Sequence, residues 1–197
     1  MYKKIVLFSL LFFTAREYAS DVTPWIEIKP SYFFFVDSPI NEIYDDGGFQ
    51  VQGSVSFPLC NHLDFYSSIG YRQAWGHALN SLEETNIKVV PFDVGLKPVF
   101  NFSEKFYYFF AGGPRFFFFQ QNNDSLYVNS IVQGGGIGFF VNTGFNVIIA
   151  DHFLLGIFGE YSYENKAMNG VNSENILSNG LVQIGGLAFG INLGYAF

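Results

Sequence analysis

The sequence predicts an all-β fold, a closed antiparallel up-and-down barrel of about eight strands that spans a membrane, and three observations lead to it. Hydrophobic residues make up 49% and aromatic residues 20% of the chain, whereas charged residues are only 14%, about half the share usual in soluble domains. No apolar stretch approaches the roughly 18 uncharged residues that a membrane-spanning helix needs. Apolar residues instead alternate with period 2 from Trp25 onward, and a closed barrel is the other architecture that crosses a bilayer.

The first residues predict an export signal. Lys3 and Lys4 precede an apolar run over residues 5–13, and Ala19 with Ser20 offers small residues for cleavage. The apolar run is too short for a membrane anchor. Residues 1–19 are therefore predicted to be a signal peptide and residues 20–197 a single barrel domain, with the cleavage site open by a few residues because Glu17 or Tyr18 stands where a small residue is preferred.

Eight alternating segments follow in order. The clearest is the last, in which large apolar residues on one face alternate with Ala188, Gly190, Asn192, Gly194 and Ala196, the small side chains that a narrow barrel interior requires. The predicted strands are 25–36, 47–59, 63–75, 87–102, 106–120, 132–149, 153–164 and 181–197. Tight turns at 60–62, 103–105 and 150–152 alternate with longer polar loops at 37–46, 76–86, 121–131 and 165–180, as in bacterial outer-membrane barrels.

The export signal, the eight segments, the alternation of turns and loops, and the aromatic C-terminal strand together support a family resemblance. In that strand Phe197 is preceded by Tyr195, Leu193 and Ile191. Over the whole mature chain the pattern resembles the small outer-membrane barrel proteins of the outer membrane protein A, X and W type. The resemblance implies an outer-membrane location, contact with outer-membrane lipid and lipopolysaccharide, and recognition of the C-terminal strand by the barrel-assembly machinery. It carries no catalytic motif onto this sequence.

The alternation also separates the two faces of the predicted barrel wall. The larger apolar set is expected to face lipid, and it includes Ile28, Tyr32, Phe34, Val51, Val55, Phe57, Phe92, Val94, Leu96, Phe139, Val141 and Phe145. The opposite set then points into the lumen with Gln50, Gln52, Asn142, Asn146 and most strand charges: Glu27, Lys29, Asp64, Arg72, Asp93, Lys97, Arg115, Glu160 and Glu164. A basic residue facing lipid at mid-bilayer would cost about 2–4 kcal/mol. We expect the near-balanced charges to form a salt-bridged plug, with a gated pore or proton-linked path as the alternative.

Two features fit this scheme less simply. Pro30, Pro91, Pro98 and Pro114 lie inside predicted strands, where each removes a backbone donor and normally marks an edge or bulge. We therefore expect bulges or strand ends there, and a sharp bend at residues 134–136. Aromatic girdles are expected from Tyr71, Trp75, Tyr161 and Tyr163 at one rim and from Tyr108 and Tyr195 at the other.

The sequence gives little indication of catalysis. His62 and His152 fall in predicted turns and His77 near a loop, without a companion serine and carboxylate in a recognisable motif. Cys60 is the only cysteine, so no intramolecular disulfide can form. The glycines at 134–138 precede neither a helix nor a basic residue, which disfavours a phosphate loop. We expect no cofactor and no metal, and the net charge of -7 argues against a nucleic-acid partner.

The loops are the expected place of function because they vary freely and face outward. Asp37, Glu42, Asp45 and Asp46 in the first loop and Glu83 and Glu84 in the second form acidic surfaces. These carboxylates are expected to keep the rim solvated, with weak divalent-cation binding or contact with a basic partner as alternatives. The predicted function is a structural, adhesive or host-interaction role. A narrow channel for ions or small hydrophobic solutes is the first alternative, and a lipid-modifying enzyme is the second.

Overall fold

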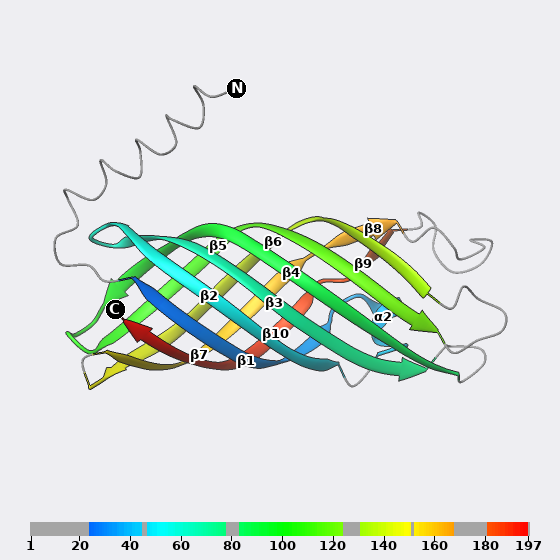
Figure 1. Cartoon of the computed structure of the whole chain (residues 1–197), viewed down its shortest axis with the longest axis horizontal. Coiled ribbons are helices and arrows are strands. Elements are labelled where there is room, and N and C mark those ends of the chain that lie inside the picture. Colours follow the sequence, from blue (N-terminus) through cyan, green and yellow to red (C-terminus); the bar gives the residue numbers. More distant parts are fainter. Residues whose placement is uncertain are drawn as a thin grey trace, which may run out of the picture.

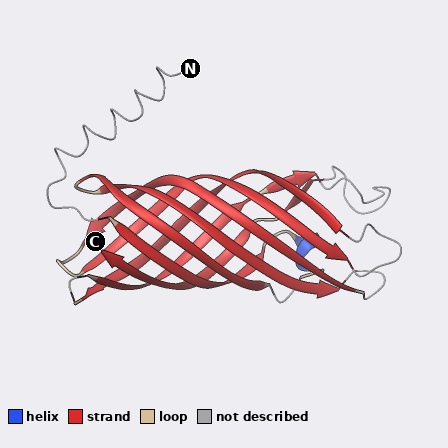
Figure 2. Cartoon of the chain, in the orientation of Figure 1, coloured by secondary structure: helices blue, strands red, loops and turns tan. Residues whose placement is uncertain are grey.

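The computed structural model describes residues 24–44, 47–77, 83–123, 131–150, 152–167 and 181–196. The described chain is almost entirely strand, with one short helix (Figures 1 and 2). The elements are β1 (Trp25–Phe35), α2 (Ser38–Asn41), β2 (Gly48–Cys60), β3 (Leu63–His77), β4 (Glu84–Asn101), β5 (Phe106–Asn123), β6 (Ile131–Ile149), β7 (Phe153–Tyr163), β8 (Asn165–Ala167), β9 (Leu181–Gln183) and β10 (Gly186–Ala196). No helix in the described ranges is long and apolar enough to cross a membrane. The predicted signal peptide and its cleavage site lie outside them.

Eight strands close into one barrel in the order β1-β10-β7-β6-β5-β4-β3-β2. Every neighbouring pair is antiparallel, and β1 pairs with both β2 and β10, so the sheet has no free edge. This arrangement confirms the predicted up-and-down barrel. We call the end that carries the short turns the turn end, and the opposite end, where α2, β8 and β9 lie, the loop end (Figure 1).

The predicted boundaries of the first seven strands agree with the observed ones to within three residues. The prediction of one continuous strand over 181–197 was wrong. The chain leaves the barrel wall at Ile184 and Gly185, and β9 pairs with β8 in a separate two-stranded sheet. The physical reason is burial, because the Ile184 side chain is fully buried in an apolar cluster at the loop end while its backbone N–H donates to the Glu164 carbonyl (2.7 Å).

Pro30, Pro91, Pro98 and Pro114 lie in their strands without the expected bulges. Each of them pairs with a residue of one neighbouring strand and with no residue of the other. Pro30 pairs with Val51 of β2 but with no residue of β10, and Pro91 pairs with Phe117 of β5 but with no residue of β3. The register is the same before and after each gap. The register shift recorded for the barrel strands lies instead between Pro58 and Cys60, and pairing of β5 with β6 continues through residues 134–136 without one.

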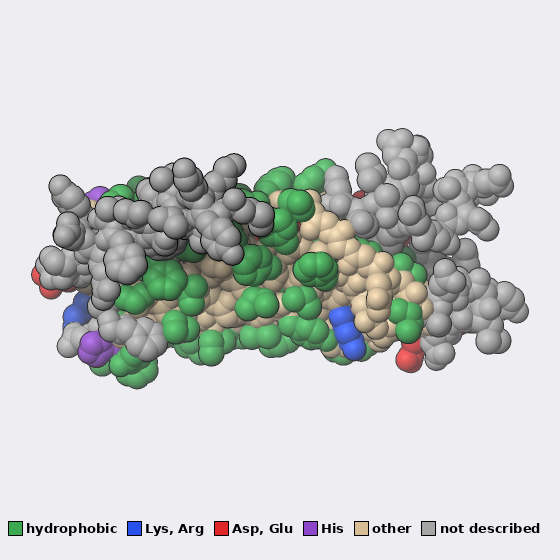
Figure 3. Space-filling model, turned by 45° about the horizontal axis from the view of Figure 1, so that its top comes forward, with side chains coloured by type: hydrophobic (Ala, Val, Ile, Leu, Met, Phe, Trp, Pro, Cys, Tyr) green, Lys and Arg blue, Asp and Glu red, His purple; other side chains and the backbone are tan. Residues whose placement is uncertain are grey.

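Exposed hydrophobic side chains occur on every strand of the barrel, and those on one face are spread along its length (Figure 3). They form an apolar belt on the outer face of the barrel. Ile28, Ile137 and Phe189 are each more than half exposed, and the other residues predicted to face lipid lie on the same face. Trp75 is 60% exposed and Tyr195 40% exposed, at the loop and turn ends respectively, as expected of interfacial girdles. An apolar surface that encircles the molecule exceeds what soluble monomers expose, so the belt faces lipid.

Candidate functional site

The lumen collects the charged side chains that the strands turn inward. The structure places eight of the nine predicted residues in direct ion pairs, with side chains at most 3% exposed. They form an arginine cluster (Arg72, Asp93, Arg115, Glu160, Glu164) and a lysine cluster (Glu27, Lys29, Lys97). The ninth, Asp64, lies half-buried near the turn end and has no ion pair within the described part of the chain.

The arginine cluster links β3, β4, β5 and β7 across the lumen. Arg115 donates to Asp93 Oδ1 (2.6 Å), Glu160 Oε1 (2.9 Å) and Glu164 Oε1 (3.2 Å). Arg72 donates to the same two glutamate oxygens at 3.0 and 3.3 Å. Two guanidinium groups therefore face three carboxylates, which leaves this cluster with one excess negative charge.

The lysine cluster has the opposite balance. Glu27 accepts from Lys97 Nζ at 2.8 Å and lies 3.1 Å from Lys29 Nζ, so two ammonium groups share one carboxylate. Aromatic rings supply further stabilisation, because Lys29 Nζ lies 4.9 Å from the ring centre of Tyr66 and Lys97 Nζ lies 4.9 Å from that of Phe109. The excess positive charge here compensates the excess negative charge of the arginine cluster.

Tyr66 and Phe140 join the two clusters. Their side chains are fully buried with ring centres 5.6 Å apart; Lys29 donates to the Tyr66 hydroxyl (3.2 Å), and the Arg115 guanidinium lies 5.5 Å from the Phe140 ring centre. Buried charges of this kind persist only when they are paired and hydrogen-bonded. The mid-lumen is thus filled by a buried network of ion pairs and rings that links the strands to one another.

A second closure, which we call the apolar plug, lies at the loop end. It consists of Ile40, Tyr44 and Ile184, all at most 4% exposed, packed against inward side chains of the strands: Phe33, Phe35, Ala74, Ile87, Val89, Phe117 and Phe119. The Tyr44 hydroxyl bonds Thr85 Oγ1 (3.1 Å). Burial raises the pKa of Tyr44 to about 12, although the Thr85 hydrogen bond acts in the opposite direction.

Sequence reasoning missed this plug. The signal that could have revealed it is the run Phe116–Phe119, which places Phe117 and Phe119 in the lumen and Phe116 and Phe118 on the lipid face. A strand that is apolar on both faces indicates a partner inside the barrel as well as lipid outside. The first loop, which supplies Ile40 and Tyr44, is joined to β9 by a hydrogen bond from the backbone N–H of Gln183 to Asp37 Oδ2 (2.8 Å).

The remaining predicted site residues are distributed as follows. Glu42 and Glu84 are exposed at the loop end, and Asp45 and Asp46 lie outside the described residues. Ile191, Leu193 and Tyr195 face outward on β10, while Phe197 is outside the described residues. The described ranges contain no group of three or more histidine, cysteine or acidic residues placed to hold a metal.

An eight-stranded barrel with an apolar outer belt and a polar, filled lumen defines a membrane-spanning barrel of the outer-membrane class. The fold is similar to that of Neisserial surface protein A, with a TM-score of 0.60 and 14% identity over 88% of this chain and 97% of that one. It is also similar to the attachment invasion locus protein Ail of Yersinia pestis (TM-score 0.56, 12% identity, 90% and 100% coverage). A third is the N-terminal β-barrel domain of OprF from Pseudomonas aeruginosa (TM-score 0.51, 12% identity, 89% and 97% coverage).

The sequence matches no protein-family model and no curated protein. At these identities the structural likeness concerns the fold, and it confirms the predicted resemblance to small eight-stranded outer-membrane barrels at that level. With the lipid-facing belt, it makes the chain an outer-membrane β-barrel. Outer-membrane barrels have short periplasmic turns and longer extracellular loops, so we expect the turn end to be periplasmic and the loop end extracellular.

Proposed function

We propose that the protein is an anchored outer-membrane barrel that acts through its four extracellular loops, in a structural, adhesive or host-contact role. The observation that carries this proposal is the double closure of the lumen. The ion-pair clusters fill its middle, and the apolar plug fills its extracellular half. With the middle and the extracellular half of the lumen occupied, the surface left for recognition on the outside of the cell is the loop end.

The closed lumen weighs against the first alternative, a channel. A conducting path would have to pass Arg72 and Arg115, whose side chains are at most 3% exposed, and then Tyr44 and Ile184 above them. Opening such a path would separate buried charges from their partners, at about 3–5 kcal/mol for each pair. Planar-bilayer recordings of the refolded protein test this directly: we expect no large, stable conductance, and observing one would favour the channel.

The charge of the loops indicates the chemistry of their partner. Residues 37–46, 76–86, 121–131 and 165–180 contain eight carboxylates (Asp37, Glu42, Asp45, Asp46, Glu83, Glu84, Asp124, Glu174) and one lysine (Lys166). The Ail protein has been crystallised with the heparin analogue sucrose octasulfate. A polysulfated ligand would be repelled by the loops of this chain. We therefore propose a basic partner surface, with weak binding of divalent cations as a second role for the same carboxylates.

A charge-neutralising loop variant tests the proposal. Cells that display the wild-type protein should adhere to a surface carrying a basic protein, and Glu83→Gln with Glu84→Gln should reduce this adhesion several-fold. The matched control is Glu104→Gln in the turn between β4 and β5, at the periplasmic end. Equal adhesion of wild type, loop variant and control would show that these loop carboxylates do not bind the basic surface.

The second alternative, a lipid-modifying enzyme, finds less support. Within the described ranges the histidines lie at the two rims, with His62 and His152 at the turn end and His77 at the end of β3, and no serine hydroxyl bonds any of them. We propose a non-enzymatic role. Mass spectrometry of lipid A from cells with and without the protein would contradict it if a modification depended on one of these histidines.

Biogenesis supplies one further proposed partner, the barrel-assembly machinery. Ile191, Leu193 and Tyr195 are 40–46% exposed on the outer face of β10, where another protein can reach them before the barrel closes. We expect Tyr195→Ser to reduce the amount of heat-modifiable barrel in outer membranes while leaving refolding into detergent intact. The matched control is Tyr161→Ser on β7, also on the outer face.

A further inference from the structure

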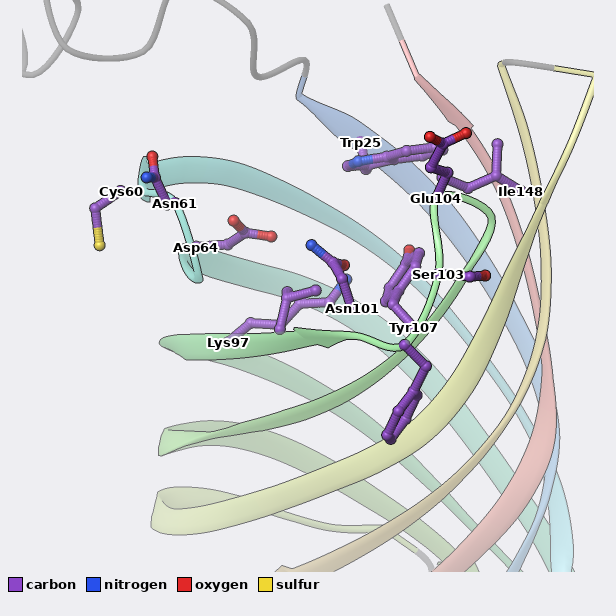
Figure 4. A pocket seen from close by; sticks show the side chains of 12 residues that line it. Trp25, Cys60, Asn61, Asp64, Lys97, Asn101, Ser103, Glu104, Tyr107 and Ile148 are labelled. Carbon is purple, nitrogen blue, oxygen red and sulfur yellow. The ribbon is translucent and has the colours of Figure 1, made fainter.

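A cavity of about 550 Å³ opens at the periplasmic end of the barrel, and Lys97 of the lysine cluster is one of the residues that line it (Figure 4). Its lining comes from β1, the β2–β3 turn, the β4–β5 region and β6, and includes Trp25, Asp64, Lys97, Val99, Tyr107 and Ile148. The volume lies in the range of about 300–1,000 Å³ typical of small-molecule sites. None of the functions considered above uses this cavity.

The charge of the cavity favours a cation. Asp64 lines it, and within the described part of the chain its carboxylate has neither a hydrogen bond nor an ion pair. Lys97, the basic residue of the lining, donates its ammonium to Glu27 Oε1 (2.8 Å) and Ser56 Oγ (3.2 Å), and its charge acts on Asp64 without a direct ion pair. Glu104 adds a second carboxylate, which stands on a different side of the opening from Asp64 (Figure 4).

The walls of the cavity favour a cation with a carbon skeleton over a metal ion. Trp25, Val99 and Ile148 pack as one apolar surface against Tyr107 and its buried neighbours. Asn61 and Asn101 add amide oxygens to the lining. Immediately deeper in the lumen the protein already holds ammonium groups against rings, with Lys97 Nζ 4.9 Å and Lys29 Nζ 5.3 Å from the centre of Phe109. The same combination of carboxylate and aromatic surface suits an alkylammonium ligand.

We infer that this cavity is a periplasmic binding site for small organic amines, and that linear diamines and polyamines are its best ligands. One ammonium group pairs with Asp64, the alkyl chain lies along Trp25, Val99 and Ile148, and a second ammonium group pairs with Glu104 at the opening. The site is independent of the loop function proposed above, because the two lie at opposite ends of the barrel (Figure 1).

The two tryptophans make the inference directly measurable. They lie at opposite ends of the barrel, Trp25 in the cavity and Trp75 on the outer face of β3. In a Trp75→Phe background, folded into detergent, the emission of Trp25 reports on the cavity alone. Spermidine should change that emission with a saturable dependence on concentration, whereas 1,4-butanediol and sodium butyrate should not.

Two variants with the same change in net charge separate a site from general attraction. Asp64→Asn should weaken spermidine binding at least tenfold, and Glu84→Gln, exposed at the loop end, should leave it unchanged. Heat-modifiable gel mobility confirms that both variants are folded. A linear, unsaturable response, equal weakening by both variants, or wild-type binding by Asp64→Asn would overturn the inference.

Discussion

Replacing Arg115 with leucine tests whether the arginine cluster holds the barrel together. Arg115 is fully buried and is the guanidinium that bonds Asp93, through contacts of 2.6 and 2.8 Å. In the variant, Asp93 keeps the hydrogen bond from Ser68 Oγ (2.6 Å) but loses its cation, and Glu160 and Glu164 share Arg72 alone. Three carboxylates would then face one base.

Breaking a buried ion pair by removing one partner destabilises a protein by about 3–5 kcal/mol, because the remaining charge is uncompensated. We expect a loss of this size in the free energy of unfolding, measured by urea titration of the protein in phospholipid vesicles. The control is Lys88→Leu, which removes a half-buried base that has no ion pair within the described ranges and should change stability by about 0.5 kcal/mol or less.

A second substitution shows whether the loss comes from charge. Arg115→Leu combined with Asp93→Leu removes one of the stranded carboxylates, so the double variant should be more stable than the sum of the two single effects, with a coupling of about 0.5–3 kcal/mol. A loss below about 1 kcal/mol for Arg115→Leu, or strict additivity in the double variant, would refute the reasoning. Either result would mean that the lumen is hydrated enough to solvate these groups.

Three further predictions concern the ion-pair clusters, the apolar plug and the first loop. The double variant Lys29→Ala with Arg115→Ala should clearly lower the free energy of unfolding, whereas the ion flux through planar bilayers should change little. Since the pKa of Tyr44 is raised to about 12, its contribution to holding the plug is complete below the unfolded value near 10 and is lost as pH rises toward 12; Tyr44→Phe should remove this dependence, monitored by protease sensitivity of the loops. Gly47 has φ of 67° and an added Cβ would lie 2.2 Å from the Phe33 carbonyl oxygen, so Gly47→Ala should destabilise the first loop by more than about 1 kcal/mol, seen as faster proteolysis there.

Much of the barrel follows from period-2 alternation, because lipid outside and a narrow lumen inside impose opposite requirements on successive side chains. The alternation therefore predicts that Glu27 and Lys29 face the lumen, where both are fully buried. The helix α2 has four residues, Ser38–Asn41, with a proline in its first turn. Such a segment is too short to show a period, so its burial against the strands depends on tertiary packing alone.

The sequence alone does not predict which charged side chains pair with one another in the lumen. Alternation places Arg72 and Glu160 on the inner face, but whether they meet depends on the stagger of strands whose residues are 88 positions apart. The same limit explains Asp64, which shares the inward face yet lies too close to the turn end to join a cluster. The cavity at the turn end is lined by residues from several strands and turns. Its presence therefore depends on how the strands are arranged, which the pattern of a single strand does not reveal.

The contacts of the arginine cluster have a consequence for how the barrel assembles. Arg72 on β3 and Arg115 on β5 reach carboxylates on β7 and beyond it, at separations of 88 and 45 residues. A sheet grown hairpin by hairpin from β1 would therefore carry Arg72 without a carboxylate partner, and Arg115 paired with Asp93 alone, until β7 is added. Half-built sheets are disfavoured in the bilayer for this reason, and closure becomes a cooperative step in which charge neutralisation and joining of β1 to β10 occur together.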